Sequence, residues 1–208
     1  MNVTLLRITE SPEELIELAA SICTDTTPSE EAMMTALNSG HLSITEHTQF
    51  TFLVEGVSRV LLAQLTRHRL ASFSVQSQRY VDMKEMPVVV PPTIYRDKEI
   101  FDEYNDLMDR VRAFYRKAIQ RGVAKEDARY AAPGAVHTKL IMTMNTRELL
   151  HFLQLRDCNK AQWEIRNLAS IILAICKTKM PHVFQNAGAP CRNTGCTETR
   201  PCKEGPKA

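Results

Sequence analysis

The basic segment from Gly56 to Val81 is the part of this sequence best suited to binding an anion. It has no acidic residue, and its local charge of +4 exceeds the net charge of +2 of the whole chain, because it contains Arg59, Arg67, Arg69 and Arg79 in addition to His68. Guanidinium groups bind phosphate or carboxylate through paired hydrogen bonds, and neutral partners lie nearby at Gln64, Ser72, Ser74 and Ser77. We therefore predict an anion site here; the alternative is an exposed basic turn without a ligand.

A second polar group follows a predicted strand. Asn145 can cap the helix that begins there, Arg147 and His151 lie one turn apart on one face, and Arg156 comes just after that helix. These four side chains could converge on one anionic or heteroaromatic ligand. The alternative is structural: Asn145 only caps, Arg147 pairs with Glu148 or another carboxylate, and His151 is a core histidine.

The spacing of residues excludes several other kinds of site. Neither GxxxxGK[ST] nor GxGxxG occurs, so no glycine-rich loop is available for phosphate. His41 and His47 with Glu46 do not match the HExxH pattern of zinc sites. Cys158 has no base at an obvious spacing and is read as a buried thiol. We expect no metal; a small zinc site in the tail is a less favoured alternative, at Cys191, Cys196 and Cys202.

Composition limits the class of protein. The chain has 208 residues, of which 44% are hydrophobic and 24% charged, which is typical of one globular domain. The nearly neutral net charge argues against nucleic acid as a partner. The longest apolar stretch, Leu168 to Cys176, is far shorter than the roughly 20 residues of a membrane span. With no signal peptide at the N-terminus, we expect a cytoplasmic protein with reduced cysteines.

The remaining sequence predicts the elements that must position these groups. Apolar periodicity and capping boxes predict helices that begin after Ser11 and Thr27, the second ending at Gly40, and further helices at 58–68, 98–121, 125–131, 145–153 and 161–177. Alternation predicts strands at 49–54 and 135–144, and residues 71–83 are expected to form an ordered loop. We predict an α+β fold with a single domain at residues 1–185 and an irregular, cysteine-rich tail at 186–208.

One combination of motifs resembles a known family. Arg67-His68-Arg69, followed by seven residues and Ser77, resembles the signature of the flavin-dependent thymidylate synthases. Other matching segments occur in the family's order: His41 to His47, Gln64, Ala128-Arg129 before Pro133, Asn145 with Arg147, Leu155-Arg156, and Ala161 to Ile165. The resemblance covers about residues 10 to 185, and the joint order of the motifs is its most specific feature.

The resemblance implies a fold and an activity. It implies a small central, mostly antiparallel sheet flanked by long helices, in a homotetramer whose active sites lie between subunits. The implied reaction is the reductive methylation of dUMP to dTMP, in which methylenetetrahydrofolate provides the methylene group and FAD, reduced by NADPH, provides the hydride. By this resemblance no cysteine nucleophile is required, and we expect neither a membrane nor a nucleic acid as a partner.

The resemblance also implies which residues bind these ligands. The FAD residues are Ser43, Arg67, His68, Arg69, Val75, Asn145, Thr146, Arg147 and His151. The dUMP residues are Gln64, Leu65, Thr66, Arg67, Val75, Gln76, Ser77, Gln78, Arg79, Arg129 and Arg156, of which Ser77, Arg79 and Arg129 are assigned to the phosphate. Arg156 is expected to be catalytic, because C5 of uracil is a poor nucleophile unless negative charge collects on the ring, where a fixed guanidinium stabilises it.

Three positions depart from the commoner family pattern. Val75 stands where Glu or Gln is frequent, so only its backbone or packing can contact the flavin. Lys160 replaces a frequent histidine. His151 replaces a frequent asparagine, although histidine and asparagine can both donate a hydrogen bond.

Two other functions are weighed against this one. Phe73 and Tyr80 beside the arginines would suit an RNA- or nucleotide-binding module, but that function leaves Asn145, Arg147 and Arg156 unexplained. A flavoprotein that acts on a pyrimidine nucleotide without methylation is the other alternative.

Overall fold

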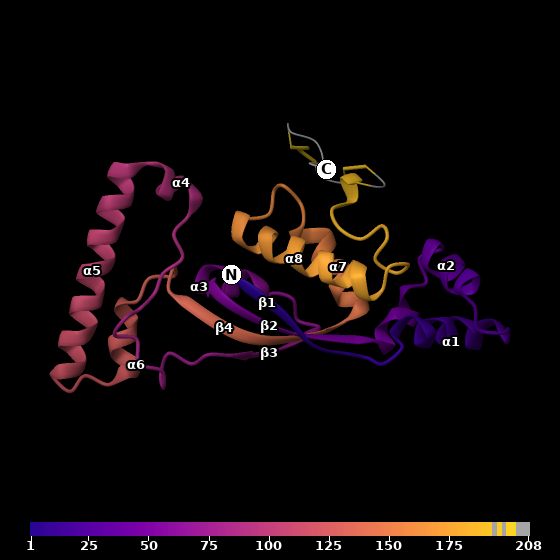
Figure 1. Cartoon of the computed structure of the whole chain (residues 1–208), viewed down its shortest axis with the longest axis horizontal. Coiled ribbons are helices and arrows are strands. Elements are labelled where there is room, and N and C mark those ends of the chain that lie inside the picture. The colour runs from indigo at the N-terminus through magenta and orange to yellow at the C-terminus, as the bar shows by residue number, and fades with distance from the viewer. Residues whose placement is uncertain (193–194, 197–198, 203–208) are drawn as a thin grey trace. The chain divides into compact units, whose positions relative to one another are not determined.

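Alternating burial along two neighbouring strands builds the centre of the sheet. β2 (Gln49–Ser58) buries Phe50, Phe52 and Val54, and β4 (His137–Asn145) alternates in the same way. In this computed structural model, which describes residues 1–192, 195–196 and 199–202, the described strands form one antiparallel sheet in the order β1, β2, β4, β3 (Figure 1). The outer strands are β1 (Asn2–Ile8) and β3 (Ala71–Val75). The predicted α+β fold with a small antiparallel sheet and flanking helices is confirmed.

The chain forms two compact units. The first contains residues 1–54, 64–73 and the described residues from 141 onward, and the second contains 55–63 and 74–140. Helices of the first unit are α1 (Pro12–Thr24), α2 (Glu30–Asn38), the 3₁₀ helix η1 (Leu42–His47), α7 (Thr146–Arg156), α8 (Trp163–Lys179) and the 3₁₀ helix η3 (Pro190–Arg192). Those of the second are α4 (Pro92–Arg96), α5 (Lys98–Gln120), α6 (Lys125–Ala128) and the 3₁₀ helix η2 (Arg129–Ala131), while α3 (Arg59–Leu65) has residues in both. The domain boundary predicted at residue 185 stays a prediction.

Aromatic packing fixes the core of the first unit. The ring of Phe50 stacks on Phe52 and meets Phe184 edge-on, with centroids 5.9 and 5.8 Å apart. α7 and α8 lie together over one face of the sheet (Figure 1), and α7 contributes the fully buried Phe152. Each fully buried Phe contributes about 1.5–3 kcal/mol, so this core can hold α7 in a fixed position on the sheet.

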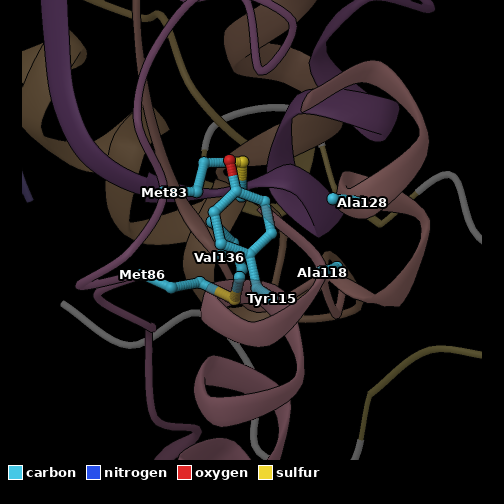
Figure 2. Close-up of a cluster of buried hydrophobic side chains, with 6 residues drawn as sticks. All are labelled: Met83, Met86, Tyr115, Ala118, Ala128 and Val136. Atoms are coloured by element: carbon cyan, nitrogen blue, oxygen red, sulfur yellow. The ribbon is translucent and has the colours of Figure 1, made fainter. Parts of the chain in front are cut away.

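Tyr115 is central to the core of the second unit. Figure 2 shows its ring among Met83, Met86, Val136 and the alanines at 118 and 128. Tyr115 belongs to α5, whose apolar residues recur at helical spacing. Its buried hydroxyl has no hydrogen-bond partner among the described residues.

The ends of the first two helices test the capping predictions. α2 ends as predicted, since Gly40 takes a φ of 81° while its N–H donates to Leu37 and the N–H of His41 donates to Ala36. α1 begins at Pro12 as predicted, but Ser11 has a φ of 40° and makes no side-chain cap. The prediction that Ser11 caps is therefore wrong, because a capping side chain reaches the helix N–H groups from an extended backbone. α2 is capped by Ser29 rather than Thr27.

The two outer strands are where the sequence-based prediction fails. Residues 71–75 form β3 rather than a loop, and β1 was not predicted. No residue of either strand is fully buried. The burial alternation of β1 is broken at Leu5 and Leu6, and that of β3 extends over only five residues, so both signals are weaker than those of β2 and β4. Among the described residues, no helix is long and apolar enough to cross a membrane.

Candidate functional site

Exposed and buried side chains alternate in the turn that follows α3. The N–H of His68 donates to the carbonyl of Leu65 where the helix ends. His68 then turns inward and is only 5% exposed, whereas Arg67 and Arg69 on either side of it are exposed. The segment therefore holds one buried imidazole between two accessible guanidinium groups.

Both polar groups predicted from the sequence contribute to one cavity of about 600 Å³, which we call the arginine cavity. Its basic and histidine side chains are Arg67, His68, Arg69, His151, Arg156 and Lys160. Glu148 is the one acidic residue that lines it within the described part of the chain. A cavity with this excess of cations and of a size typical for ligand sites suits an anionic ligand.

Hydrogen bonds connect the two groups at the wall of the cavity. Nδ1 of His68 lies 2.9 Å from Oε1 of Glu148, and Nε of Arg156 donates to Nε2 of His68 at 3.1 Å. Nη2 of Arg156 also donates to the carbonyl of Gln64 at 3.4 Å. The His68 ring packs edge-on against Phe152. Arg156 is therefore held by the polypeptide through two of its nitrogens.

Burial and charge shift the pKa values at this wall. Burial lowers the pKa of His68 and nearby Arg156 acts in the same direction, whereas the hydrogen bond to Glu148 opposes the shift. Burial also lowers the pKa of Arg156, with a contribution from Arg67. Since a guanidinium has a pKa far above neutrality, Arg156 stays charged while His68 is favoured as the neutral imidazole.

The start of α7 holds the rest of the second polar group. The side chain of Asn145 accepts a hydrogen bond from the N–H of Glu148 at 2.8 Å, so Asn145 caps α7 as predicted. Arg147 pairs with Glu46 of η1, which is the kind of carboxylate pairing that the structural alternative expected. Thr146 is fully buried, and its hydroxyl lies 2.5 Å from that of Thr48. Neither Asn145, Thr146 nor Arg147 lines the arginine cavity.

Other predicted residues of the first unit lie elsewhere. Ser43 lines a different cavity of about 630 Å³ between α1 and α2, together with His41. Leu65 is fully buried and Thr66 is exposed, next to the half-buried Gln64. Within a single copy of the chain, Ser43 therefore does not share a cavity with Arg67.

The second unit holds the remaining residues assigned to dUMP. Gln76, Ser77 and Gln78 line a cavity of about 430 Å³, and Val75 precedes them half-buried. The cavity also contains Thr138, which is 3% exposed and whose hydroxyl has no partner among the described residues. An unpaired buried hydroxyl is costly, so a polar ligand would satisfy it.

Two of the residues predicted to bind the phosphate of dUMP contact Glu126 of α6. Arg79 binds the carboxylate of Glu126 through Nε at 2.9 Å and Nη2 at 2.8 Å, and Nε of Arg129 donates to the carbonyl of Glu126 at 3.1 Å. The hydroxyl of Ser77 accepts the N–H of Arg79 at 3.2 Å. Arg79, Arg129 and Ser77 are thus linked by hydrogen bonds within one unit.

The cysteines do not assemble a metal site in the part of the chain that the structure describes. Cys191 and Cys196 line the arginine cavity, whereas Sγ of Cys202 lies 3.9 Å from Nδ2 of Asn159. No group of three or more His, Cys, Asp or Glu residues in residues 1–192, 195–196 and 199–202 is arranged to hold a metal ion. Cys158 also lines the arginine cavity and is half-buried.

Sequence reasoning missed several residues of these cavities. Glu148 was considered only as part of a capping box and as a partner of Arg147, although a glutamate in the first turn of an otherwise apolar helix face can be buried against a distant histidine. No sequence feature pointed to Thr138 as a cavity residue, because threonine is common in strands. The tail residues at the arginine cavity were likewise not predicted to line it.

Comparisons with known proteins identify the family to which the chain is similar. The family model described as "Thymidylate synthase complementing protein" (Thy1) matches residues 4–182. The chain is 40% identical over 219 residues to a flavin-dependent thymidylate synthase from Geobacter sulfurreducens, covering 99% of this chain and 92% of that protein. It is 38% identical to the protein of that name from Clostridium tetani, covering 95% and 91%, and 47% identical to that from Nitratidesulfovibrio vulgaris, covering 78% and 70%.

Proposed function

This chain belongs to the Thy1 family, and from that membership we propose that it is a flavin-dependent thymidylate synthase, which converts dUMP to dTMP. We further propose that methylenetetrahydrofolate provides the methylene group and NADPH the reducing equivalents. The observation that carries the proposal is the arginine cavity, where polar residues 80 positions apart, such as His68 and Glu148, come into hydrogen-bond contact.

The lining of the arginine cavity suits an anionic flavin. Arg67, Arg69, Arg156 and Lys160 outnumber the single carboxylate of Glu148, which is already hydrogen-bonded to His68. Cations of this kind can bind the phosphates of FAD. When bound, the flavin supplies the hydride chemistry that no protein side chain can perform. We assign His151 and Arg67 to the flavin on the same grounds, and the other predicted flavin residues by family membership.

Arg156 is the residue we propose for activation of dUMP. Transfer of a one-carbon group to C5 requires negative charge on the uracil ring, and a fixed cation stabilises that charge where it develops. Arg156 meets the requirement because its guanidinium stays charged and is held by His68 and Gln64. The same group cannot act as a base, so its contribution is electrostatic.

Arg79, Arg129 and Ser77 are the residues we propose for the phosphate of dUMP. Both arginines already bind Glu126, the first through its exposed carboxylate and the second through its carbonyl oxygen. A phosphate dianion would compete with this carboxylate for Arg79, because guanidinium groups bind phosphate and carboxylate in the same two-pronged geometry.

We propose that the enzyme is a cytoplasmic homotetramer in which residues of different copies complete each site. Exposed apolar residues on α5 support association, since Ile100, Leu107 and Phe114 are 47%, 53% and 57% exposed and recur every seven residues on one helix face. Ser43 also supports it, because its cavity is separate from that of Arg67 in one copy. A second copy could bring the two together.

Absorption spectra and turnover test the function directly. The purified chain should show bound-flavin bands after addition of FAD, and dUMP should perturb them. With NADPH and methylenetetrahydrofolate present, dUMP should be converted to dTMP. A flavin that oxidises NADPH but forms no dTMP would instead indicate a flavoprotein that acts on the nucleotide without methylation. Absence of flavin binding, with salt-sensitive RNA binding, would reject the proposal.

A further inference from the structure

Glu148 is a buried carboxylate for which the proposed reaction has no direct use. Its side chain is 7% exposed, and that of its partner His68 is 3% exposed. Burying a carboxylate beside an imidazole is costly unless the pair is well hydrogen-bonded, and the pair lies at the wall of the arginine cavity. A buried charge at this place calls for an explanation.

The hydrogen bonds of His68 define its tautomer. A guanidinium can only donate, so Nε2 of His68 must be the acceptor of the bond from Nε of Arg156. The ring proton is therefore on Nδ1, which donates to Oε1 of Glu148 at 2.9 Å. The opposite tautomer would direct an N–H at the N–H of Arg156 and leave Glu148 without its proton donor. A protonated His68 would create the same clash.

We propose that Glu148 is a positioning residue that acts on Arg156 through His68, by holding the imidazole in the tautomer that accepts the Arg156 hydrogen bond. This proposal rests on the role proposed above for Arg156. We call Glu148, His68 and Arg156 the Glu148 triad. The carboxylate selects the Nδ1–H form, Nε2 then orients the guanidinium plane, and the Gln64 carbonyl fixes its second nitrogen. The lowered pKa of His68 agrees with a neutral ring.

The position of Glu148 supports this role. It is in the first turn of α7, where the capping bond from its N–H to Asn145 fixes its backbone, and Arg156 is the last residue of the same helix. His68 comes from a distant segment and bridges the two ends of this helix. The Phe152 ring, from the middle of α7, packs against the imidazole with centroids 5.2 Å apart. The imidazole is thus restrained on three sides.

The resting tautomer is the first test. Two-bond proton–nitrogen correlation spectra of the wild-type protein, labelled with nitrogen-15 in its histidines, should show His68 protonated at Nδ1, with the assignment made by loss of the signal in His68→Gln. A His68 protonated at Nε2 would overturn the proposal. This measurement needs no substrate, so it remains valid even if the wild-type protein forms no dTMP, a result that would reject the proposed function instead.

Kinetics of Glu148→Gln are the second test. The Gln amide has both a donor and an acceptor, so it can pair with either tautomer of His68 and selection of the Nδ1–H form is lost. The same occurs in enzymes where a carboxylate that orients a histidine is replaced by an amide. We expect kcat to fall about 10- to 100-fold, while flavin binding is kept and the KM for dUMP changes much less. Glu148→Asp keeps the charge and should retain more kcat than Glu148→Gln.

A matched control separates positioning from general stability. Glu13→Gln alters another largely buried carboxylate of the same unit that binds a histidine, since Oε2 of Glu13 lies 3.1 Å from Nδ1 of His182, and it does not line the arginine cavity. This variant should lose stability but keep kcat. Equal kcat in Glu148→Gln and wild type, or equal losses in Glu148→Asp and Glu148→Gln, would reject the proposal. If Glu148→Gln does not fold, Glu148→Asp and the wild-type tautomer carry the test.

Discussion

Replacing Arg156 by alanine should abolish most of the turnover while leaving the flavin bound. The structure gives the guanidinium a fixed place, because Nε and Nη2 are bound to His68 and Gln64. Loss of one preorganised donor at a developing charge typically costs about 10²–10³ in kcat, or about 3–4 kcal/mol of transition-state stabilisation. The variant also leaves Nε2 of His68 without its donor, so we expect up to about 1–3 kcal/mol less stability.

The assay must separate these two effects. dTMP formation at saturating dUMP gives kcat, the flavin absorption bands give cofactor occupancy, and denaturant unfolding gives the loss of stability. Arg166→Ala is a matched control, since Arg166 is also half-buried in the first unit and donates to a backbone carbonyl, that of Asn159 at 3.0 Å, without lining the arginine cavity. It should keep kcat. Turnover of Arg156→Ala within tenfold of wild type, or parallel loss of flavin and activity, would refute the assigned role.

Three further outcomes are expected. Arg67→Ala should weaken the binding of both FAD and dUMP, because Arg67 is assigned to both ligands. Equilibrium titrations in which only one ligand loses affinity would assign Arg67 to that ligand alone. Leu107→Glu on the exposed apolar face of α5 should shift sedimentation toward smaller species, whereas an unchanged sedimentation coefficient would exclude this face as an interface. The pKa of His68 is lowered from 6.5 in the folded chain. Just below pH 6.5 the unfolded chain therefore binds a proton that the folded chain does not, so the free energy of unfolding should decrease as the pH falls from 6.5 toward the folded-state pKa. Denaturant unfolding at neutral and mildly acidic pH checks this, and the same pH dependence in His68→Gln would assign it to other groups.

The inner strands and the long helices could be predicted because their burial is periodic. Phe50, Phe52 and Val54 alternate in β2, and α5 shows a clear helical spacing. β1 and β3 are at the two ends of the sheet and contain no fully buried residue, so the signal is interrupted in β1 and only five residues long in β3. The prediction that Ser11 caps α1 was wrong for a different reason, because the capping-box residues do not specify the backbone conformation of Ser11 itself.

The candidate site could be predicted in its residue types but not in its connections. The sequence indicated Arg67, His68 and Arg156 as members of two polar groups, and these members of both groups line the arginine cavity. The pairing of His68 with Glu148 was not predictable from spacing, because it depends on how α7 packs over the sheet. The position of Ser43 at a separate cavity was equally invisible in the linear order of the motifs.

The long sequence separations at the arginine cavity have a consequence for folding. His68 contacts residues 80 and 88 positions away, so the cavity exists only after two large loops have closed. Local helices can form before this step, but the binding surface cannot. A refolding chain should therefore recover its secondary structure before it recovers affinity for flavin. Since ligands that bind only the native state stabilise it by mass action, bound cofactor would then lower the fraction of folded chains that reopen and become exposed to aggregation and proteolysis.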